Sequence, residues 1–197
     1  MKIVLLILLL IPLGIDATTY PKLSLEKFNN ISDVNVIVKI TSKEVSKNSE
    51  NEYCDRIGRG QVIELFKGPK NVEVISFNIY KGMEVGEYYH LMLKDTSSKK
   101  SYKTTTNSEM MEDERREQER CLSAKKPDYT ILMEGIGSTK VDLDVKGTLE
   151  NAMISYSNNW VVPPESITVK VISEGWDGRA EVRYTDLVEY LESQNTK

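Results

Sequence analysis

Residues 60–93 contain three short β-type runs joined by two tight connections, and this stretch limits the fold of the chain more than any other. The first run, Gln61–Lys67, is apolar on both faces, which is typical of a strand near the middle of a sheet. The segment 68–71 (GPKN) predicts a turn after it. A second loop, Lys81–Gly86, leads into the last run, Glu87–Lys94. Such short connections favour strands that lie side by side in one sheet.

The middle run, Val72–Ile79, changes phase along its length. Val72 and Val74 share one face of an extended chain, whereas Ile75 and Phe77 share the other. A β-bulge near Val74 would reconcile the two alternations, because a bulge adds one residue to a strand. The phase change therefore predicts a bent strand.

An earlier run, Val34–Ile40, alternates between apolar and polar residues and predicts a half-buried strand. We expect four runs to be consecutive neighbours in one strongly bent antiparallel sheet that closes towards a barrel: Val34–Ile40, Gln61–Lys67, Val72–Ile79 and Glu87–Lys94. Side chains fill the interior of a small closed barrel. Any binding would then use its rim, its loops or its outer face.

Further strand patterns follow at Tyr129–Glu134, Val141–Val145 and Ile167–Ile172. Two prolines precede the last of these and confine it to a sheet edge or to the beginning of a strand. Thr185 is a candidate N-cap for a short amphipathic helix, Asp186–Ser193. Together these patterns predict a mostly β protein with a short C-terminal helix.

The strongest helix candidate is Glu109–Leu122, which follows the candidate N-cap Ser108. Acidic residues crowd its first turns, where the helix dipole favours negative charge. Its apolar residues are too few for a broad core stripe, so we expect a surface helix. The charge run is interpreted as a solvated face, and a docking surface for a basic partner is the alternative.

Met1–Ala17 has one basic residue followed by an apolar run that Pro12 and Gly14 interrupt. This pattern predicts a secretory signal peptide, and an uncleaved anchor is the alternative. No other apolar stretch is long enough to span a bilayer. We therefore expect a secreted or periplasmic protein that does not span the membrane, with residues 18–197 forming one β-barrel domain with a C-terminal extension.

The chain has two cysteines, Cys54 and Cys121, and both lie in the part that would be exported. In an oxidising compartment such a pair most simply forms one disulfide. Two free thiols, or one reactive cysteine, are the alternatives. A formal net charge of −4 with scattered basic residues argues against a nucleic-acid partner.

No established catalytic or zinc-binding motif occurs in the sequence. The only histidine, His90, alternates with its neighbours in a strand pattern and is interpreted as a sheet-surface residue. Asp142 and Asp144 share one strand face and could bind calcium or act in acid–base chemistry, although solvated carboxylates are the usual explanation. Trp160 and Trp176 are expected to be partial core rather than a ligand surface. We therefore assign no catalytic, cofactor-binding or metal-binding residue.

An ordered set of features carries a family resemblance: the early strand Val34–Ile40, a strand that ends at Leu65–Gly68, and the Gly-x-x-Tyr entry Gly86–Tyr89 into an apolar run. The set resembles the netrin-like module, the OB-type barrel also found in tissue inhibitors of metalloproteinases and in many short exported bacterial proteins. The resemblance covers about residues 33–131 and implies an OB-like antiparallel barrel. In that family a cysteine often follows the next polar loop, a place that Cys121 could occupy.

One departure from the family limits what the resemblance implies about function. The animal inhibitors chelate the protease zinc through a Cys-x-Cys at the mature N-terminus, whereas this chain would begin at Thr18 and has no cysteine before Cys54. Metalloproteinase inhibition is therefore not assigned. We expect an exported, non-enzymatic module that binds an unknown protein or envelope component. The alternative is a small exported hydrolase whose acidic residues or Cys54 assemble an unrecognised site.

Overall fold

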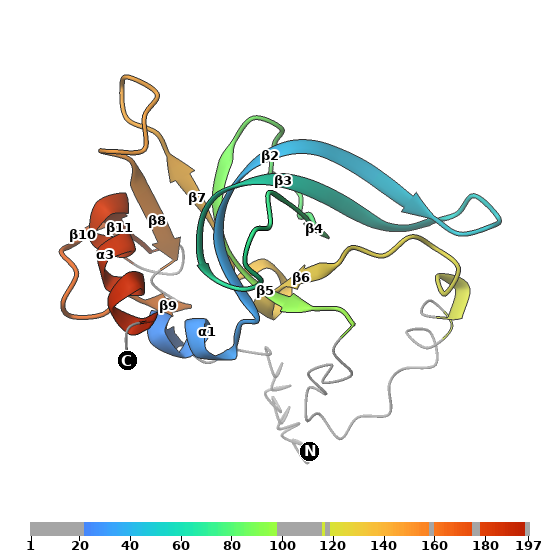
Figure 1. Cartoon of the computed structure of the whole chain (residues 1–197), viewed down its shortest axis with the longest axis horizontal. Helices are drawn as coiled ribbons and strands as arrows, with labels where there is room; N and C mark the ends of the chain where they lie inside the picture. The colour runs from blue at the N-terminus through green and yellow to red at the C-terminus, as the bar shows by residue number, and fades with distance from the viewer. Residues whose placement is uncertain (1–21, 98–115, 117–118, 158–159, 175–177, 196–197) are drawn as a thin grey trace, which may run out of the picture.

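The computed structural model describes residues 22–97, 116, 119–157, 160–174 and 178–195. It is mostly β, with a barrel that a C-terminal extension flanks (Figure 1). The first part of the chain forms β1 (Leu23–Ser24), α1 (Leu25–Ile31), β2 (Val34–Lys47), β3 (Tyr53–Lys67), β4 (Val74–Asn78), β5 (Tyr88–Asp95) and β6 (Tyr129–Ile131). The extension contains the 3-10 helix η1 (Leu132–Gly135), β7 (Ser138–Asp142), β8 (Met153–Ser157), β9 (Val161–Val162), β10 (Val169–Ser173), β11 (Arg179–Arg183) and α3 (Tyr184–Asn195).

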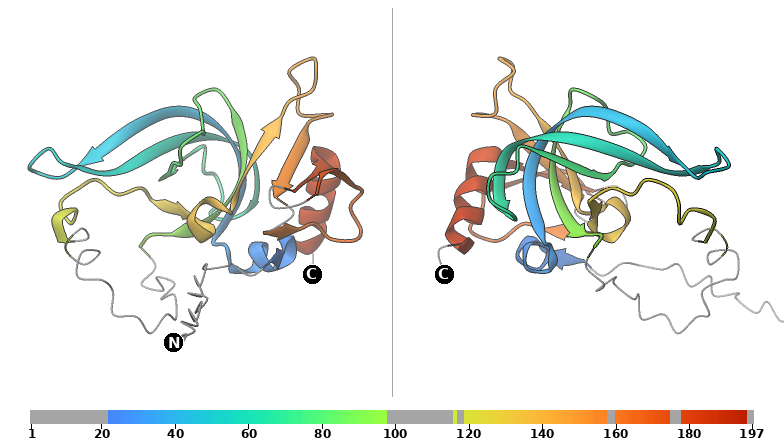
Figure 2. Two further views of the ribbon diagram at one scale, coloured as in Figure 1. Left: turned by 180° about the vertical axis from the view of Figure 1, so that it is seen from behind. Right: turned by 45° about the vertical axis from the view of Figure 1, so that its right-hand side comes forward.

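Five strands close into a barrel. β2 pairs with both β3 and β5, β3 pairs with β4, and β6 joins β4 to β5. If the barrel strands β2, β3, β4, β5 and β6 are numbered 1 to 5 along the chain, their order around the barrel is 1-2-3-5-4-1. This order is the connectivity of an OB-type barrel. The two views of Figure 2 show the curved β2–β3 pair wrapping over this barrel. The predicted OB-like fold is confirmed.

The predicted arrangement of the strands differs from the observed one in the place of β5 and in the direction of one strand pair. β5 lies beside β2 and not beside β4, which it reaches only through β6. The β4–β6 contact is parallel and joins Phe77 to Tyr129, so the barrel is not wholly antiparallel. Both differences have the same cause: β6 fills the gap between β4 and β5, and its short, weakly patterned sequence does not reveal that position.

The predicted bulge near Val74 is also absent from the described pairing of β4. β4 begins at Val74 and pairs with β3 without a register shift, from Gln61 opposite Val74 to Ile57 opposite Asn78. The phase change arises because Val72 precedes the strand. The bulges lie instead in the β2–β3 pair, where the register shifts at four places and lets the strands curve.

Apolar side chains fill the interior of the barrel, as closure of so small a sheet requires. They alternate along β2 and are joined by residues of β4, β5 and β6 and of the loop after β4. The buried members are Val34, Val36, Val38, Ile40, Ile75, Phe77, Ile79, Met83, Tyr89, Leu91, Leu93 and Ile131.

Gly60 allows β3 to pass close to the side chains of this core. A Cβ atom at Gly60 would lie 2.8 Å from the Cβ of Val38 and 3.3 Å from the ring of Phe77. We expect Gly60→Ala to lower the free energy of unfolding by about 1–3 kcal/mol through overpacking, measured by denaturant titration. Gly58→Ala is the comparison, because its Cβ would lie 3.1 Å from the nearest atom of Ile79 and 3.2 Å from the ring of Phe77, which are looser contacts than the 2.8 Å contact at Gly60. Equal losses in the two variants would contradict the prediction.

Beyond the barrel, β2 and β3 continue as a long two-stranded ribbon (Figure 1). Near its tip Cys54 forms a disulfide with Cys121, with the Cα atoms 5.6 Å apart. The Lys125 ammonium pairs with Glu44, and the Ser46 hydroxyl donates to the Lys125 carbonyl. The predicted disulfide is confirmed, and no cysteine among the described residues is free.

Most strands of the extension continue the barrel sheet, and of those described only β9 lies outside it, in a two-stranded parallel sheet with β1. The first half of β5 pairs with β7, and the order then runs β7, β8, β11 and β10. β10 lies at the edge of the described sheet, as the two prolines before it predict, and its valines are exposed. α3 packs on β3 and β11. Leu187 and Leu191 of α3 are fully buried, so the predicted C-terminal helix is confirmed.

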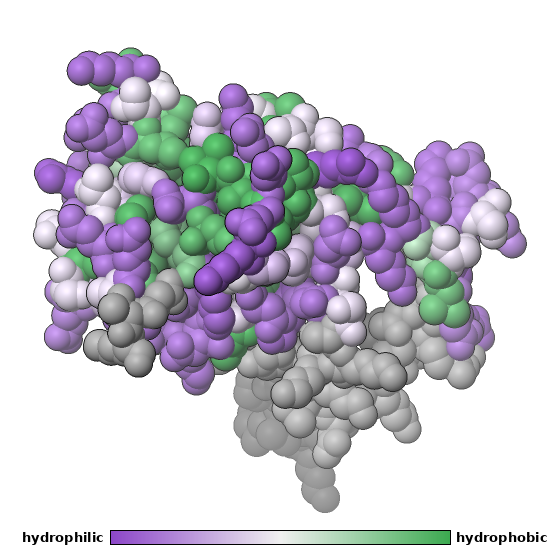
Figure 3. Space-filling model, viewed as in Figure 1, coloured by the Kyte–Doolittle hydropathy of each residue, from purple (hydrophilic) through white to green (hydrophobic). Residues whose placement is uncertain are grey.

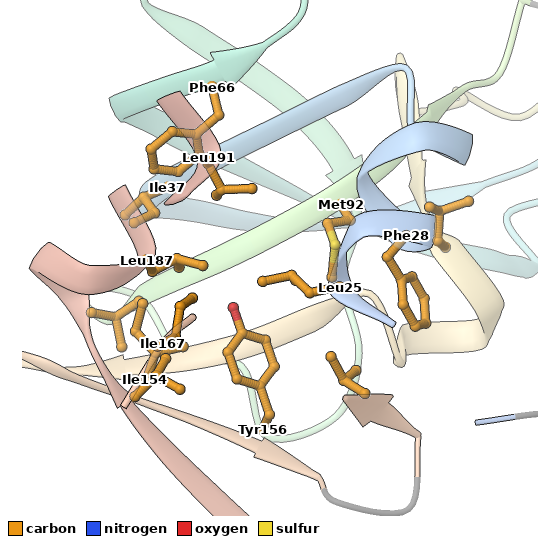
Figure 4. Packing of buried hydrophobic residues seen from close by; sticks show 14 of the residues in the cluster. Leu25, Phe28, Ile37, Phe66, Met92, Ile154, Tyr156, Ile167, Leu187 and Leu191 are labelled. Atoms are coloured by element: carbon orange, nitrogen blue, oxygen red, sulfur yellow. The ribbon is translucent and has the colours of Figure 1, made fainter. Parts of the chain in front are cut away.

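A second core lies between the extension, α1, α3 and the outer face of the barrel (Figure 4). α1 was not predicted from the sequence. It begins after Ser24, whose side chain accepts a hydrogen bond from the Lys27 amide, and it buries Leu25 and Phe28. On the face seen in Figure 3, apolar residues gather in the middle, between extension and barrel, with polar residues around them.

Two predicted segments fall on residues that the structure does not describe or describes only in part. The signal peptide Met1–Ala17 lies wholly outside the described residues. Of the predicted surface helix Glu109–Leu122, the described positions Arg116, Glu119 and Arg120 are helical and exposed, whereas Cys121 and Leu122 lie in a turn. No helix in the described part of the chain is both long enough and apolar enough to cross a membrane.

Candidate functional site

A surface groove of about 640 Å³ lies where the barrel meets the extension. Its walls come from the loop after β4, from η1 and from the chain around β9, and its floor comes from β7, β8 and β11. The left view of Figure 2 shows η1, β7 and β8 from behind the view of Figure 1. The lining residues are Tyr80, Gly135, Ile136, Ser138, Thr139, Lys140, Asp142, Ser155, Ser157, Trp160, Val161, Gly178 and Arg179. We call this hollow the groove.

The barrel wall of the groove depends on a close contact between Tyr80 and Gly135. A Cβ atom on Gly135 would lie 3.2 Å from the tyrosine ring, and Gly135 has a φ of +100°. Glycine is the residue that adopts this backbone conformation without strain. The ring of Tyr80 can therefore lie against the backbone, and the Ser138 hydroxyl donates to the Gly135 carbonyl at 2.6 Å, which joins η1 to β7.

The floor of the groove is polar because β7, β8 and β11 alternate between two faces. Val141, Ile154, Tyr156, Ala180 and Val182 are buried against α1 and α3, and their neighbours point the other way. This opposite face carries hydroxyl and charged side chains. Arg179 stands directly across from Ser157 in the β8–β11 pairing, so the two residues are neighbours on this face.

Charges of both signs line the groove. The Lys140 ammonium lies 2.6 Å from the Glu87 carboxylate, which also accepts a hydrogen bond from the Tyr89 hydroxyl. These two donors, Lys140 first, hold the pKa of Glu87 below its usual range, and the same ion pair raises the pKa of Lys140. In the part of the chain that the structure describes, Asp142 and Arg179 have no ion-pair partner.

Behind the floor, His90 belongs to a buried chain of hydrogen bonds. Its Nδ1 lies 2.8 Å from the Tyr156 hydroxyl and its Nε2 lies 2.6 Å from Oδ1 of Asn35. The Asn35 amide nitrogen in turn donates to Asn29 at 2.9 Å. Because Asn35 Oδ1 can only accept, Nε2 carries the imidazole proton and Nδ1 accepts from Tyr156. The chain therefore joins α1, β2, β5 and β8.

The interpretation of His90 as a sheet-surface residue is wrong, because its side chain is fully buried. His90 does point to the outer face of the barrel, but Tyr156 and the rest of the extension cover that face. Figure 4 shows Tyr156 within this cluster, its hydroxyl directed towards β5. Burial lowers the pKa of His90 to about 3, so the ring is neutral at physiological pH. Its hydrogen-bond partners are an amide and a phenol, so it performs a structural role here.

Asp142 and Asp144 do not form a shared site. Asp142 is exposed on β7 and lines the groove. Asp144 instead stabilises the loop after β7: its carboxylate accepts from the Lys146 amide and from the amide and hydroxyl of Thr148. The Thr148 and Lys146 amides contribute to a pKa of Asp144 below its usual range. Among the described residues no group of three or more candidate ligands could hold a metal ion.

Trp160 is half-buried against the second core, which confirms the partial-core expectation, and it also lines the groove. Trp176 lies outside the described residues. No motif in the sequence singles out Tyr80, Ser157 or Arg179. The alternating pattern of β7 could have indicated a polar face, but a polar strand face is ordinarily solvated, and only the neighbouring barrel wall turns this one into a groove.

No family model, curated protein or solved structure matches this chain. The resemblance to netrin-like modules therefore remains a prediction that rests on its sequence motifs.

Proposed function

We propose that this protein is an exported, non-enzymatic binding module that recognises a protein or an envelope component through the groove. The observation that carries the proposal is the arrangement of the groove itself. It combines half-buried aromatic side chains, Tyr80 and Trp160, with polar groups that face solvent. Concave sites that mix aromatic walls with a few convergent polar groups are typical binding sites.

Two features support a role in binding rather than catalysis. The only histidine is buried on the face of the sheet opposite the groove floor, where Tyr156 and Asn35 occupy both ring nitrogens. Lys140, the amine in the groove, is held as an ion pair by Glu87, which stabilises its charged form. A charged ammonium is a poor general base or nucleophile, so the groove side chains suit recognition.

Export is supported by the disulfide and by the N-terminal segment. Structural disulfides persist in oxidising compartments, and Cys54 and Cys121 are the only cysteines of the chain. Met1–Ala17 has the pattern of a signal peptide. The partner would accordingly be found outside the cytoplasm.

Position-specific crosslinking tests the proposed function. A photoreactive amino acid such as p-benzoylphenylalanine is placed at Ser157 in the groove or, as a control, at Val145, which is fully exposed on the loop after β7. Each protein is expressed in its native host and irradiated. We expect a discrete crosslinked species from position 157 and none from position 145.

The crosslinked species is then identified, purified and bound to the protein in isolation. Trp160→Ala is expected to weaken that binding, and Val145→Ala is expected to leave it unchanged. Equal crosslinking from the two positions, or chemical conversion of the purified partner by the protein, would contradict the proposal.

A further inference from the structure

We infer that the ligand of the groove is a neutral oligosaccharide, an inference that rests on the proposed binding function. The lining offers four kinds of polar group at once: serine hydroxyls, the Arg179 guanidinium, the Lys140 ammonium and the Asp142 carboxylate. A ligand that satisfies all of them must both donate and accept hydrogen bonds. Sugar hydroxyl groups do both.

The charges in the groove argue against a ligand of one sign. Asp142 would repel a polyanion, and Arg179 would repel a polycation, and both stand on the same floor. Glu87 already neutralises Lys140. The whole chain has a net charge of −4, which gives a polyanion no long-range attraction. A neutral ligand faces none of these penalties.

Asp142 and Arg179 are also available to a ligand. Neither has an ion-pair partner among the described residues, and Asp142 interacts with the Lys140 ammonium only as a nearby charge, so a ligand need not break a direct ion pair of either residue. The planar guanidinium presents several donors in a fixed fork, and Ser157 lies directly across from it. Neighbouring hydroxyl groups on a sugar ring match such a pair.

The aromatic residues supply the apolar part of the same ligand. A sugar ring has a face of C–H groups that packs against an aromatic ring, and Tyr80 and Trp160 are both half-buried with part of their surface in the groove. Tyr80 comes from the barrel and Trp160 from the extension, so the groove can contact more than one sugar unit. An open groove of about 640 Å³ accommodates a segment of a chain whose ends extend into solvent.

The test uses the mature protein and an array of immobilised glycans that includes neutral, uronic-acid-containing and sulfated oligosaccharides, with acidic and basic peptides for comparison. Affinities are measured by calorimetry at low and high NaCl. We expect binding to a neutral oligosaccharide whose affinity does not change with salt, because no net charge is neutralised. Trp160→Ala and Arg179→Lys are each expected to weaken it by about tenfold or more. Val145→Ala is the control and should leave it unchanged.

The possible outcomes separate the inference from the proposed function. Salt-sensitive binding of acidic glycans, or binding of a peptide that Trp160→Ala abolishes, overturns the inference and leaves a groove-based binding module. Absence of any glycan binding also overturns the inference. Failure of both the array and the position-157 crosslinking overturns the proposed function as well.

Discussion

Replacing Cys54 and Cys121 together by serine is expected to lower the free energy of unfolding by about 4 kcal/mol. The disulfide spans a sequence separation of 67 residues, so it removes much conformational freedom from the unfolded chain. The disulfide also ties the tip of the ribbon to the segment before β6. Its loss is therefore expected to destabilise the ribbon tip locally as well. The loss is measured by denaturant titration of oxidised wild type and variant at pH 7.

Hydrogen exchange locates the local effect. Amides near the ribbon tip, residues 44–56, are expected to exchange faster in the double variant, whereas those of the barrel half of β2 keep their protection. Reduction of the wild-type protein should reproduce both effects, which excludes a cause in the serine side chains. A variant as stable as the oxidised wild type, or a ribbon tip with unchanged exchange, would contradict the role given to the disulfide.

Acidification from pH 7 to pH 5 is expected to destabilise the protein by about 2 kcal/mol through His90 alone. The buried imidazole of the folded protein has a pKa of about 3, whereas in the unfolded chain it has its ordinary value of about 6.5. Between these values the unfolded state binds more protons than the folded state. Acid therefore favours unfolding as pH falls below about 6.5, and the effect is complete near pH 3.

Denaturant titrations at several pH values measure this slope, and His90→Gln is its control. The chain has no other histidine, so the variant should show little change in stability between pH 7 and pH 5, although it is less stable throughout. The carboxylates of Glu87 and Asp144 titrate at lower pH, because hydrogen bonds hold their pKa values below the usual range. A slope that persists in His90→Gln would show that another group causes it.

Features of the fold that depend on residues close together in the sequence, or on residue counts, could be predicted. The alternation of Val34–Ile40 placed four side chains in the barrel interior. The run Gln61–Lys67 is apolar on both faces because one face packs on the barrel core and the other on the second core; only its first residue, Gln61, is in register with β4. The pairing of Cys54 with Cys121 followed from their number. Each inference required only periodicity or counting.

The neighbours of β5 could not be predicted in the same way. One half of this strand pairs with β7 and the other half with β6, and periodicity does not say which strand lies beside which. The polar halves of β2 and β3 were missed for a related reason. Their residues form a ribbon held by pairing and by the disulfide, and not by a buried face that alternation would reveal.

His90 and the groove depend most clearly on contacts between distant parts of the chain. The alternating pattern around His90 predicts that it lies on a strand and points away from the barrel interior. Whether that outer face meets water or protein depended on the extension, which begins more than forty residues later and brings Tyr156 onto it. The opposite face of the same strands became a groove only because the barrel supplies Tyr80 as a wall. Burial and concavity arise from contacts between distant segments, and a local pattern carries no information about them.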